Sequence, residues 1–254
     1  SITHRAMALL ASAGTHVIFT GDHLFVYYGN ASISTHSSKN LMRQIELFSD
    51  SEKKMEVIRR MYRYRFPDTK ITDKGLQAFL GMEGNRMTAI YKKEAKRTGV
   101  AWNGRSYDIN DMDSSTPVNY ALSIANHALY GVCASAEVAL GYSTAIGFIH
   151  HGHMNAFTYD IADLYKAETT IPAAFEAVRD SKEHEDSDAL RKRVHQYCHE
   201  YFHRARLLKR IPKDIAMLFD LDEEMQEQEI LSTQIEVGDG LFHPDATNYG
   251  RKKP

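Results

Sequence analysis

The chain has 254 residues, with 31 Lys and Arg against 33 Asp and Glu, and 43% of its residues are hydrophobic. This length can bury a sizeable core in one large domain, or in one domain with a small companion. No segment approaches the ~18 consecutive apolar residues that a membrane-spanning helix needs, so we expect no membrane partner. The two cysteines, Cys133 and Cys198, lack CxxC spacing. Two cysteines are too few for a disulfide framework, and without CxxC spacing they favour a reducing cytoplasm as the location.

The net charge of −2 hides an uneven distribution of basic residues. Lys and Arg cluster in residues 53–65, 86–97 and 191–213, and an acidic stretch at 214–229 balances the last of these. Cationic segments interleaved with tyrosines suit a surface that binds a phosphate backbone. Solvated faces of ordinary helices carry similar charge runs, so charge alone leaves both interpretations open.

In chain order, the stretch THVIFTGDHLFVYYG predicts two short β-strands joined by a tight turn at Gly21-Asp22. From Asn40 onward the apolar residues recur at steps of three and four, which is typical of helices. We expect helices near residues 38–65, 73–99, 116–140, 158–180, 187–210 and 213–230. The predicted fold is mainly α: residues 1–35 end a β domain, residues 36–230 form a large helical catalytic domain, and residues 231–254 form a mobile tail.

Glu83 is the first candidate for chemistry, because it shares one face of its predicted helix with Met87, Ile90 and Glu94. A carboxylate on a packed face is rarely tolerated without a partner. Its alternative role is to complement the dipole of the helix near the N-terminus.

The stretch from His150 to Asp163 places imidazoles and carboxylates close together in the sequence. Asp160 and Asp163 also suit a helix start, where acidic residues are favoured. One imidazole with carboxylates from separate segments is a suitable ligand set for Mg²⁺ or Mn²⁺. A zinc hydrolase centred on HHGH is a weaker alternative, because this HxH lacks the spacing of a known zinc helix.

Four blocks carry a family resemblance: MEGNRMTAIY, AWNGRSYD, LYGVCASAEVALGYSTAIGFIHHGH and FTYDIADLYKAETTIPAAF. In this order they resemble blocks of Cas1, the CRISPR-associated integrase that inserts new spacers, in its type I-E branch. The resemblance implies that Glu83, His150 and Asp163 bind the metal and that Asp160 is a supporting acidic residue of the catalytic site. It also implies that this chain begins at the last helix and hairpin of the family's N-terminal β domain, with most of that domain missing.

The resemblance further implies a DNA partner and a reaction. A prespacer duplex with single-stranded 3′ ends would be joined to repeat DNA, each 3′-hydroxyl attacking a phosphodiester of the repeat. A small CRISPR-associated dimer would bridge homodimers of the integrase. The alternative is a non-catalytic DNA-binding scaffold subunit of the same complex. The residues that we expect to contact DNA are Arg86, Arg105, Tyr107, Tyr130, His153, Lys166, Arg204, Arg206 and Arg210; core packing is an equal alternative for the two tyrosines, and relatives carry lysine in place of His153.

Overall fold

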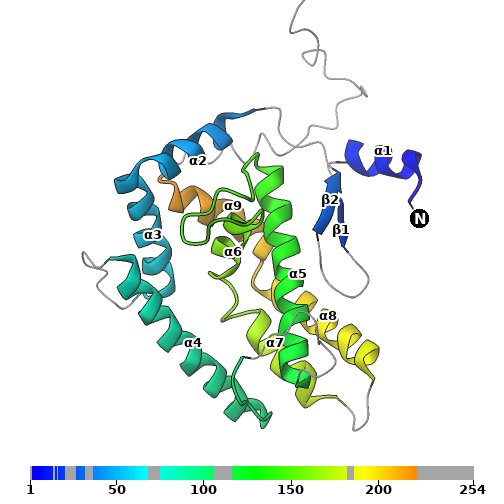
Figure 1. Cartoon of the computed structure of the whole chain (residues 1–254). Helices are drawn as coiled ribbons and strands as arrows, with labels where there is room; N and C mark the ends of the chain where they lie inside the picture. The colour runs from blue at the N-terminus through cyan, green and yellow to red at the C-terminus, as the bar shows by residue number, and fades with distance from the viewer. Residues whose placement is uncertain are drawn as a thin grey trace, which may run out of the picture.

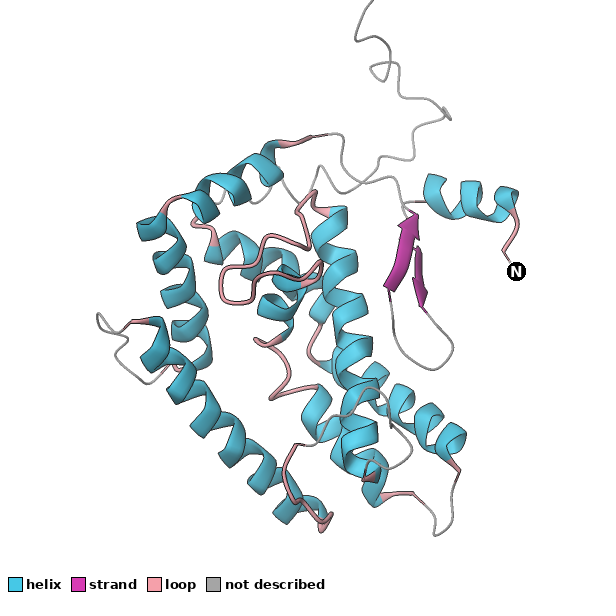
Figure 2. Cartoon of the chain, viewed as in Figure 1, coloured by secondary structure: helices cyan, strands magenta, loops and turns pink. Residues whose placement is uncertain are grey.

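The computed structural model describes residues 2–13, 15, 17–20, 27–31, 37–67, 75–105, 116–181 and 186–221. Over these ranges the chain is mainly helical, which confirms the predicted fold class (Figures 1 and 2). None of the described helices is long and apolar enough to cross a membrane. The expected C-terminal tail, residues 231–254, lies outside the described residues. The helices and strands are α1 (His4–Ser12), β1 (Val17–Thr20), β2 (Tyr27–Ala31), α2 (Lys39–Ser49), α3 (Ser51–Arg65), α4 (Leu76–Thr98), α5 (Pro117–Ala139), α6 (Ala156–Ala162), α7 (Thr170–Arg179), α8 (Ser187–Arg204) and α9 (Leu207–Leu218).

The two N-terminal strands pair in an antiparallel hairpin that contacts α5 (Figure 1). Val17 pairs with Ala31, and Thr20 pairs with Tyr27. A two-residue turn at Gly21-Asp22 would pair Thr20 with His23. Thr20 instead pairs with Tyr27, so the predicted position of the turn is wrong. Residues 21–26 join the strands and lie outside the described residues.

The predicted helix over residues 38–65 is divided into α2 and α3 at Asp50. Asp50 has an extended backbone, and its carboxylate accepts hydrogen bonds from the N–H groups of Glu52 and Lys53. This is the bonding pattern of an N-cap, which satisfies two of the free N–H groups at the start of α3. The chain therefore turns a corner where the apolar spacing alone suggests one continuous helix.

Helix α5 is the centre of the helical body, and α6, α7, α8 and α9 all pack against it (Figure 1). Its N-terminal half joins α7 and α8 in one buried cluster that includes Leu122, Phe175 and Val194. Its C-terminal half joins α3, α6 and α9 in a second cluster that includes Leu129 and Ile215. The predicted helix over 116–140 is confirmed as α5, and the prediction over 73–99 is confirmed as α4.

The predicted helix over residues 158–180 is interrupted by a series of turns at residues 163–169. Pro172 explains the restart, because proline is tolerated in the first turn of a helix and breaks an interior. It is the third residue of α7. The predicted boundary between helices at 210 and 213 is also wrong: α8 ends at Arg204, Arg206 adopts a left-handed backbone with φ of 52°, and α9 begins at Leu207.

Side chains of α2 hold one side of the long loop between α5 and α6. The buried amide of Gln44 donates to the carbonyls of Ser143 (2.9 Å) and Ile146 (3.0 Å), and its oxygen accepts the N–H of Ser143 (2.8 Å). Gly147 follows, where a Cβ atom would lie 2.5 Å from the carbonyl oxygen of His150 and 2.7 Å from the backbone of Ala156. The loop is therefore packed too closely for any residue but glycine at this position.

We expect Gly147→Ala to destabilise the protein by ~1–3 kcal/mol, because the added methyl group must displace backbone atoms rather than a flexible side chain. The matched control is Gly131→Ala in α5, where a Cβ atom meets nothing within 4 Å. This control should be neutral or stabilising by up to ~1 kcal/mol, since alanine favours a helix over glycine. Urea unfolding of both variants measures the difference, and equal stabilities would contradict the close packing at Gly147.

Candidate metal centre and nucleic-acid interface

The carboxylate of Asp160 is fully buried and accepts four hydrogen bonds from the loop before α6. Oδ2 accepts the backbone N–H groups of Phe148 (2.5 Å) and Ile149 (3.0 Å). Oδ1 accepts the backbone N–H of His150 (2.9 Å) and contacts the ring Nδ1 of the same residue at 2.7 Å. Every oxygen of this side chain is engaged, so Asp160 orients the loop and the imidazole rather than offering a free ligand atom.

This contact determines the chemistry that His150 can perform. With Nδ1–H donating to Asp160, the neutral imidazole offers its second nitrogen, Nε2, to a ligand. A carboxylate behind the imidazole is the usual partner of a metal-binding histidine, because it fixes the tautomer and raises the basicity of the ring. The hydrogen bond to Asp160 raises the pKa of His150 above its ordinary value, although partial burial opposes the increase.

Asp163 lies one turn beyond Asp160, at the end of α6, and pairs with Lys166 at 2.6 Å. Burial raises the pKa of Asp163, but the charges of Lys166 and Arg65 outweigh burial and leave the pKa below its usual value. Burial would lower the pKa of Lys166, and Asp163 and Tyr130 raise it above its usual value instead. Both groups are therefore charged at neutral pH. The suggestion that Asp160 and Asp163 begin a helix is wrong, because α6 ends at Ala162.

Glu83 approaches from α4, and its two oxygens have different surroundings. Oε1 accepts a hydrogen bond from Arg86 at 3.2 Å. Oε2 is buried and has no hydrogen-bond partner in the described part of the chain. The same centre contains Tyr62, whose phenol has its pKa raised by burial, lowered in part by Arg65, and raised further by the carboxylates of Glu83, Asp163 and Asp160. Glu83 thus faces the same buried region as the α6 carboxylates.

The donor set fits a hard divalent cation with one nitrogen ligand. Glu83 contributes an oxygen without a partner, Asp163 a charged carboxylate and His150 an oriented imidazole. Among the described residues, no three His, Cys, Asp or Glu side chains already lie close enough together to hold a metal ion. Arg86 and Lys166 instead pair with the two carboxylates. Metal binding at these residues therefore remains a prediction, and it requires both ion pairs to rearrange.

An aromatic cluster covers the imidazole side of this centre. Tyr159 contacts the rings of His150 (centroids 5.8 Å apart), His153 (5.1 Å) and Tyr130 (4.9 Å). The Nζ atom of Lys166 lies 5.0 Å from the centroid of the Tyr130 ring. The predicted DNA contacts Tyr130, His153 and Lys166 are therefore neighbours of His150. Tyr159 was not predicted as a member of this centre, although it directly precedes Asp160 in the block FTYDIADLYKAETTIPAAF.

The three predicted arginines near the start of α9 differ in how much of their charge is available. Arg204 and Arg206 are exposed, and the guanidinium of Arg204 lies 5.0 Å from the ring centroid of Tyr201. Arg210 is partly buried, pairs with Glu168 at 2.9 Å, and also contacts Tyr64 and Asp214. The charge of Arg210 is therefore largely matched within the chain, whereas the other two face solvent.

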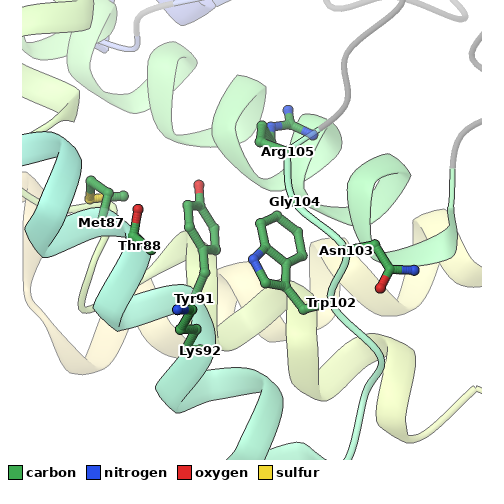
Figure 3. Close-up of a pocket in the computed structure, with 8 residues that line it drawn as sticks. All are labelled: Met87, Thr88, Tyr91, Lys92, Trp102, Asn103, Gly104 and Arg105. Carbon is green, nitrogen blue, oxygen red and sulfur yellow. The ribbon is translucent and has the colours of Figure 1, made fainter.

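Arg105 lines a cavity of about 470 Å³ between α4 and the start of α5, together with Met87, Thr88, Tyr91, Lys92, Trp102, Asn103 and Gly104 (Figure 3). Tyr91 and Trp102 stack there with ring centroids 4.5 Å apart. The guanidinium donates to the carbonyl and the side-chain oxygen of Asn119 at 3.0 Å each, and to Ser123 at 3.0 Å. These bonds fix residues 101–105 on α5, so any DNA contact by Arg105 is additional to a structural role. Tyr107 lies outside the described residues.

Comparisons with known proteins identify the family to which the chain is similar. A family model described as "CRISPR associated protein Cas1" matches residues 69–209. The CRISPR-associated endonuclease Cas1 of a Clostridium species is 41% identical over 225 residues, which cover 89% of this chain and 74% of that protein. The Escherichia coli endonuclease of the same name is 33% identical over 210 residues, which cover 83% of this chain and 67% of that protein. The crystal structure of a TtCas1–DNA complex superimposes with a TM-score of 0.71 at 39% identity, and the match covers 86% of this chain and 80% of that one. A casposase bound to its integration product shares the fold, with a TM-score of 0.63 at 16% identity.

We expect Asp160→Asn to lower the pKa of His150, because the hydrogen bond to the charged carboxylate is the largest cause of its increase. Asp163→Asn is the matched control: it removes a nearby charge without changing the bond to the ring, so it should lower the same pKa less. NMR titration of the imidazole in both variants, without added metal, gives the two shifts. An unchanged pKa of His150 in Asp160→Asn would show that the carboxylate does not orient the ring.

Proposed function

The chain belongs to the Cas1 family, and we propose that it is a metal-dependent DNA endonuclease and integrase of CRISPR adaptation. The observation that carries this proposal is the oriented imidazole of His150 beside Asp163, with the buried free oxygen of Glu83 facing the same region. These are the residue types that a phosphodiester-cleaving centre requires: hard oxygen ligands and one nitrogen. The reaction that we propose is attack by the 3′-hydroxyl of a prespacer on a phosphodiester of repeat DNA.

Glu83, His150 and Asp163 would hold Mg²⁺ or Mn²⁺, which when bound supplies charge stabilisation at the phosphorus and activates the attacking hydroxyl. Asp160 acts through His150, because its carboxylate holds Nδ1 and so directs Nε2 outward. Lys166 and Arg86 pair with the carboxylates of Asp163 and Glu83, and would become available to a DNA phosphate if a metal took their place. No covalent intermediate on a side chain is needed for this direct transfer.

The substrate and partners that we propose follow the resemblance in sequence. A prespacer duplex with single-stranded 3′ ends and the repeat DNA would lie on the basic surface that includes Arg204 and Arg206. The DNA in the solved TtCas1 complex supports a nucleic-acid partner for this chain. We further propose a homodimer, bridged by a small CRISPR-associated dimer, of the type I-E branch and acting in the prokaryotic cytoplasm.

A non-catalytic scaffold is the second candidate function, and one observation favours it. Both carboxylates of the centre are paired with cations, Glu83 with Arg86 and Asp163 with Lys166. Among the described residues, no three side chains already form a metal site. A scaffold would bind prespacer DNA with the same affinity whether or not the metal ligands are intact, and would transfer no strand. An assay of strand transfer therefore separates the two functions.

We expect Glu83→Ala, His150→Ala and Asp163→Ala each to reduce strand transfer by at least ~100-fold, because each removes a metal ligand. The assay supplies prespacer, repeat DNA, the bridging dimer and Mg²⁺ or Mn²⁺, with EDTA as the metal-free condition. In the EDTA condition, DNA binding by the three variants should match that of the wild type, since none of these side chains supplies the exposed basic surface.

Glu46→Ala is the control for removing a carboxylate, because Glu46 is an exposed residue of α2 that pairs with Arg43 and Lys53. It should retain full activity. Wild-type rates in any of the three ligand variants would contradict the assignment of that residue. Absence of transfer by the wild-type chain, with DNA binding intact, would favour the scaffold.

We expect the double reversal of Arg204 and Arg206 to Glu to weaken DNA binding and to lower the slope of log affinity against log salt by ~0.9 for each lost phosphate contact. Arg210→Glu should instead destabilise the fold, because the new carboxylate would face Glu168 and Asp214. Measuring prespacer affinity across salt concentrations, with thermal unfolding of each variant, distinguishes these effects. An unchanged slope in the double reversal would assign Arg204 and Arg206 to protein contacts.

A further inference from the structure

The phenol of Tyr62 is a buried polar group in α3 that the proposed metal ligands do not include. The side chain is 0% exposed, and its ring stacks on Phe79 with centroids 4.6 Å apart and on Phe66 at 6.1 Å. The two stacked rings hold its plane in place. Tyr62 therefore has the packing of a core aromatic residue but carries a hydroxyl that a phenylalanine would lack.

This hydroxyl has no hydrogen-bond partner in the described part of the chain. A buried hydroxyl without a partner is unfavourable, and native proteins contain few of them. Rotation of the ring does not help, because the oxygen lies on the rotation axis and stays where it is. The packing of Tyr62 thus fixes the position of its hydroxyl oxygen.

Glu83 lies in α4 one helical turn after Phe79, the residue on which the Tyr62 ring stacks. Burial raises the pKa of the Tyr62 phenol, the Arg65 guanidinium at 5.2 Å from its ring centroid opposes this increase, and the charges of Glu83, Asp163 and Asp160 add to it. Asp160 is saturated by four donors and Asp163 is paired with Lys166, whereas Oε2 of Glu83 is buried and has no partner among the described residues. A phenol donates one hydrogen bond and an ionised carboxylate only accepts them. The donor and acceptor without partners are therefore complementary, and a single water molecule can join two groups that do not touch.

We propose that Tyr62 is a positioning residue of the candidate centre, donating through an ordered water to Oε2 of Glu83 and so fixing that carboxylate for the metal. This inference rests on the proposed function, because it takes Glu83 as a ligand. Groups that orient a ligand in this way commonly change metal affinity 10- to 100-fold when removed. Tyr62 touches neither DNA nor the metal in this arrangement and acts only through Glu83.

The test compares Tyr62→Phe with Tyr64→Phe in the full chain without DNA. Mn²⁺ affinity is measured by calorimetry and by the loss of the free-ion EPR signal, and thermal unfolding is followed without metal. Tyr62→Phe keeps the stacked ring and removes only the hydroxyl, so we expect Mn²⁺ affinity to fall by about 10-fold with the melting temperature unchanged or raised. Tyr64 lies two residues away and donates to Asp214 at 2.9 Å, so Tyr64→Phe should lower the melting temperature and leave Mn²⁺ affinity unchanged.

A double-mutant cycle with Glu83→Gln shows whether the hydroxyl acts through Glu83. In the Glu83→Gln background, Tyr62→Phe should then lower Mn²⁺ affinity by much less than 10-fold. Equal Mn²⁺ affinity of Tyr62→Phe and wild type, or additive losses in the cycle, would overturn the role of Tyr62 while leaving the metal centre in place. No saturable Mn²⁺ binding by the wild-type chain would overturn the metal centre itself.

Discussion

The hydrogen bonds of the buried Asp160 carboxylate are the constraint on which the candidate centre depends. A buried carboxylate is tolerated only when donors replace its lost hydration, and here the backbone of residues 148–150 and the ring of His150 supply them. The same hydrogen bonds that stabilise the carboxylate also fix the loop against α6. Gln44 holds the other end of that loop from α2, and the close approach at Gly147 leaves it little room to move. His150 is positioned by these contacts rather than by the loop's own conformation.

A second buried network holds the turns that carry Asp163. Tyr64 from α3 and Tyr165 from the turns both donate to Asp214 of α9, at 2.9 and 2.8 Å. Burial and the Asp214 charge raise the pKa of Tyr64 to about 12, so this phenol stays protonated and remains a donor. Arg210 joins the same group, which explains why its charge is matched within the chain. The basic segment of α9 is thus partly structural, whereas the charges of its exposed neighbours Arg204 and Arg206 are available to a ligand.

Local sequence patterns were sufficient for the class of fold and for the inward-facing carboxylates of α4, whereas the ligand set of the centre came from the resemblance and stays a prediction. Apolar spacing located α4 and α5 closely, and the shared face of Glu83 and Glu94 placed both inward, with side chains 15% and 10% exposed. Spacing failed where a single side chain ends or starts a helix, as the Asp50 cap and Pro172 do, because periodicity continues across such a break. The roles of Asp160 and Tyr62 depend on partners far away along the chain. Only the folded structure shows that the first carboxylate is saturated and that the hydroxyl is not.

The balance of charge at the centre connects metal binding to DNA binding. The carboxylates of Glu83 and Asp163 pair with Arg86 and Lys166, and Arg65 donates to the backbone carbonyl of Asp160. Such a centre has little net attraction for a phosphodiester. On the proposed function, a divalent cation bound by Glu83 and Asp163 would leave Arg86 and Lys166 without their partners and make the centre strongly positive. A DNA phosphate would then restore the balance, so metal and DNA should each raise the affinity of the other by the same factor, as linkage requires. The Glu83–Arg86 and Asp163–Lys166 ion pairs would in this way delay catalysis until both metal and DNA are bound.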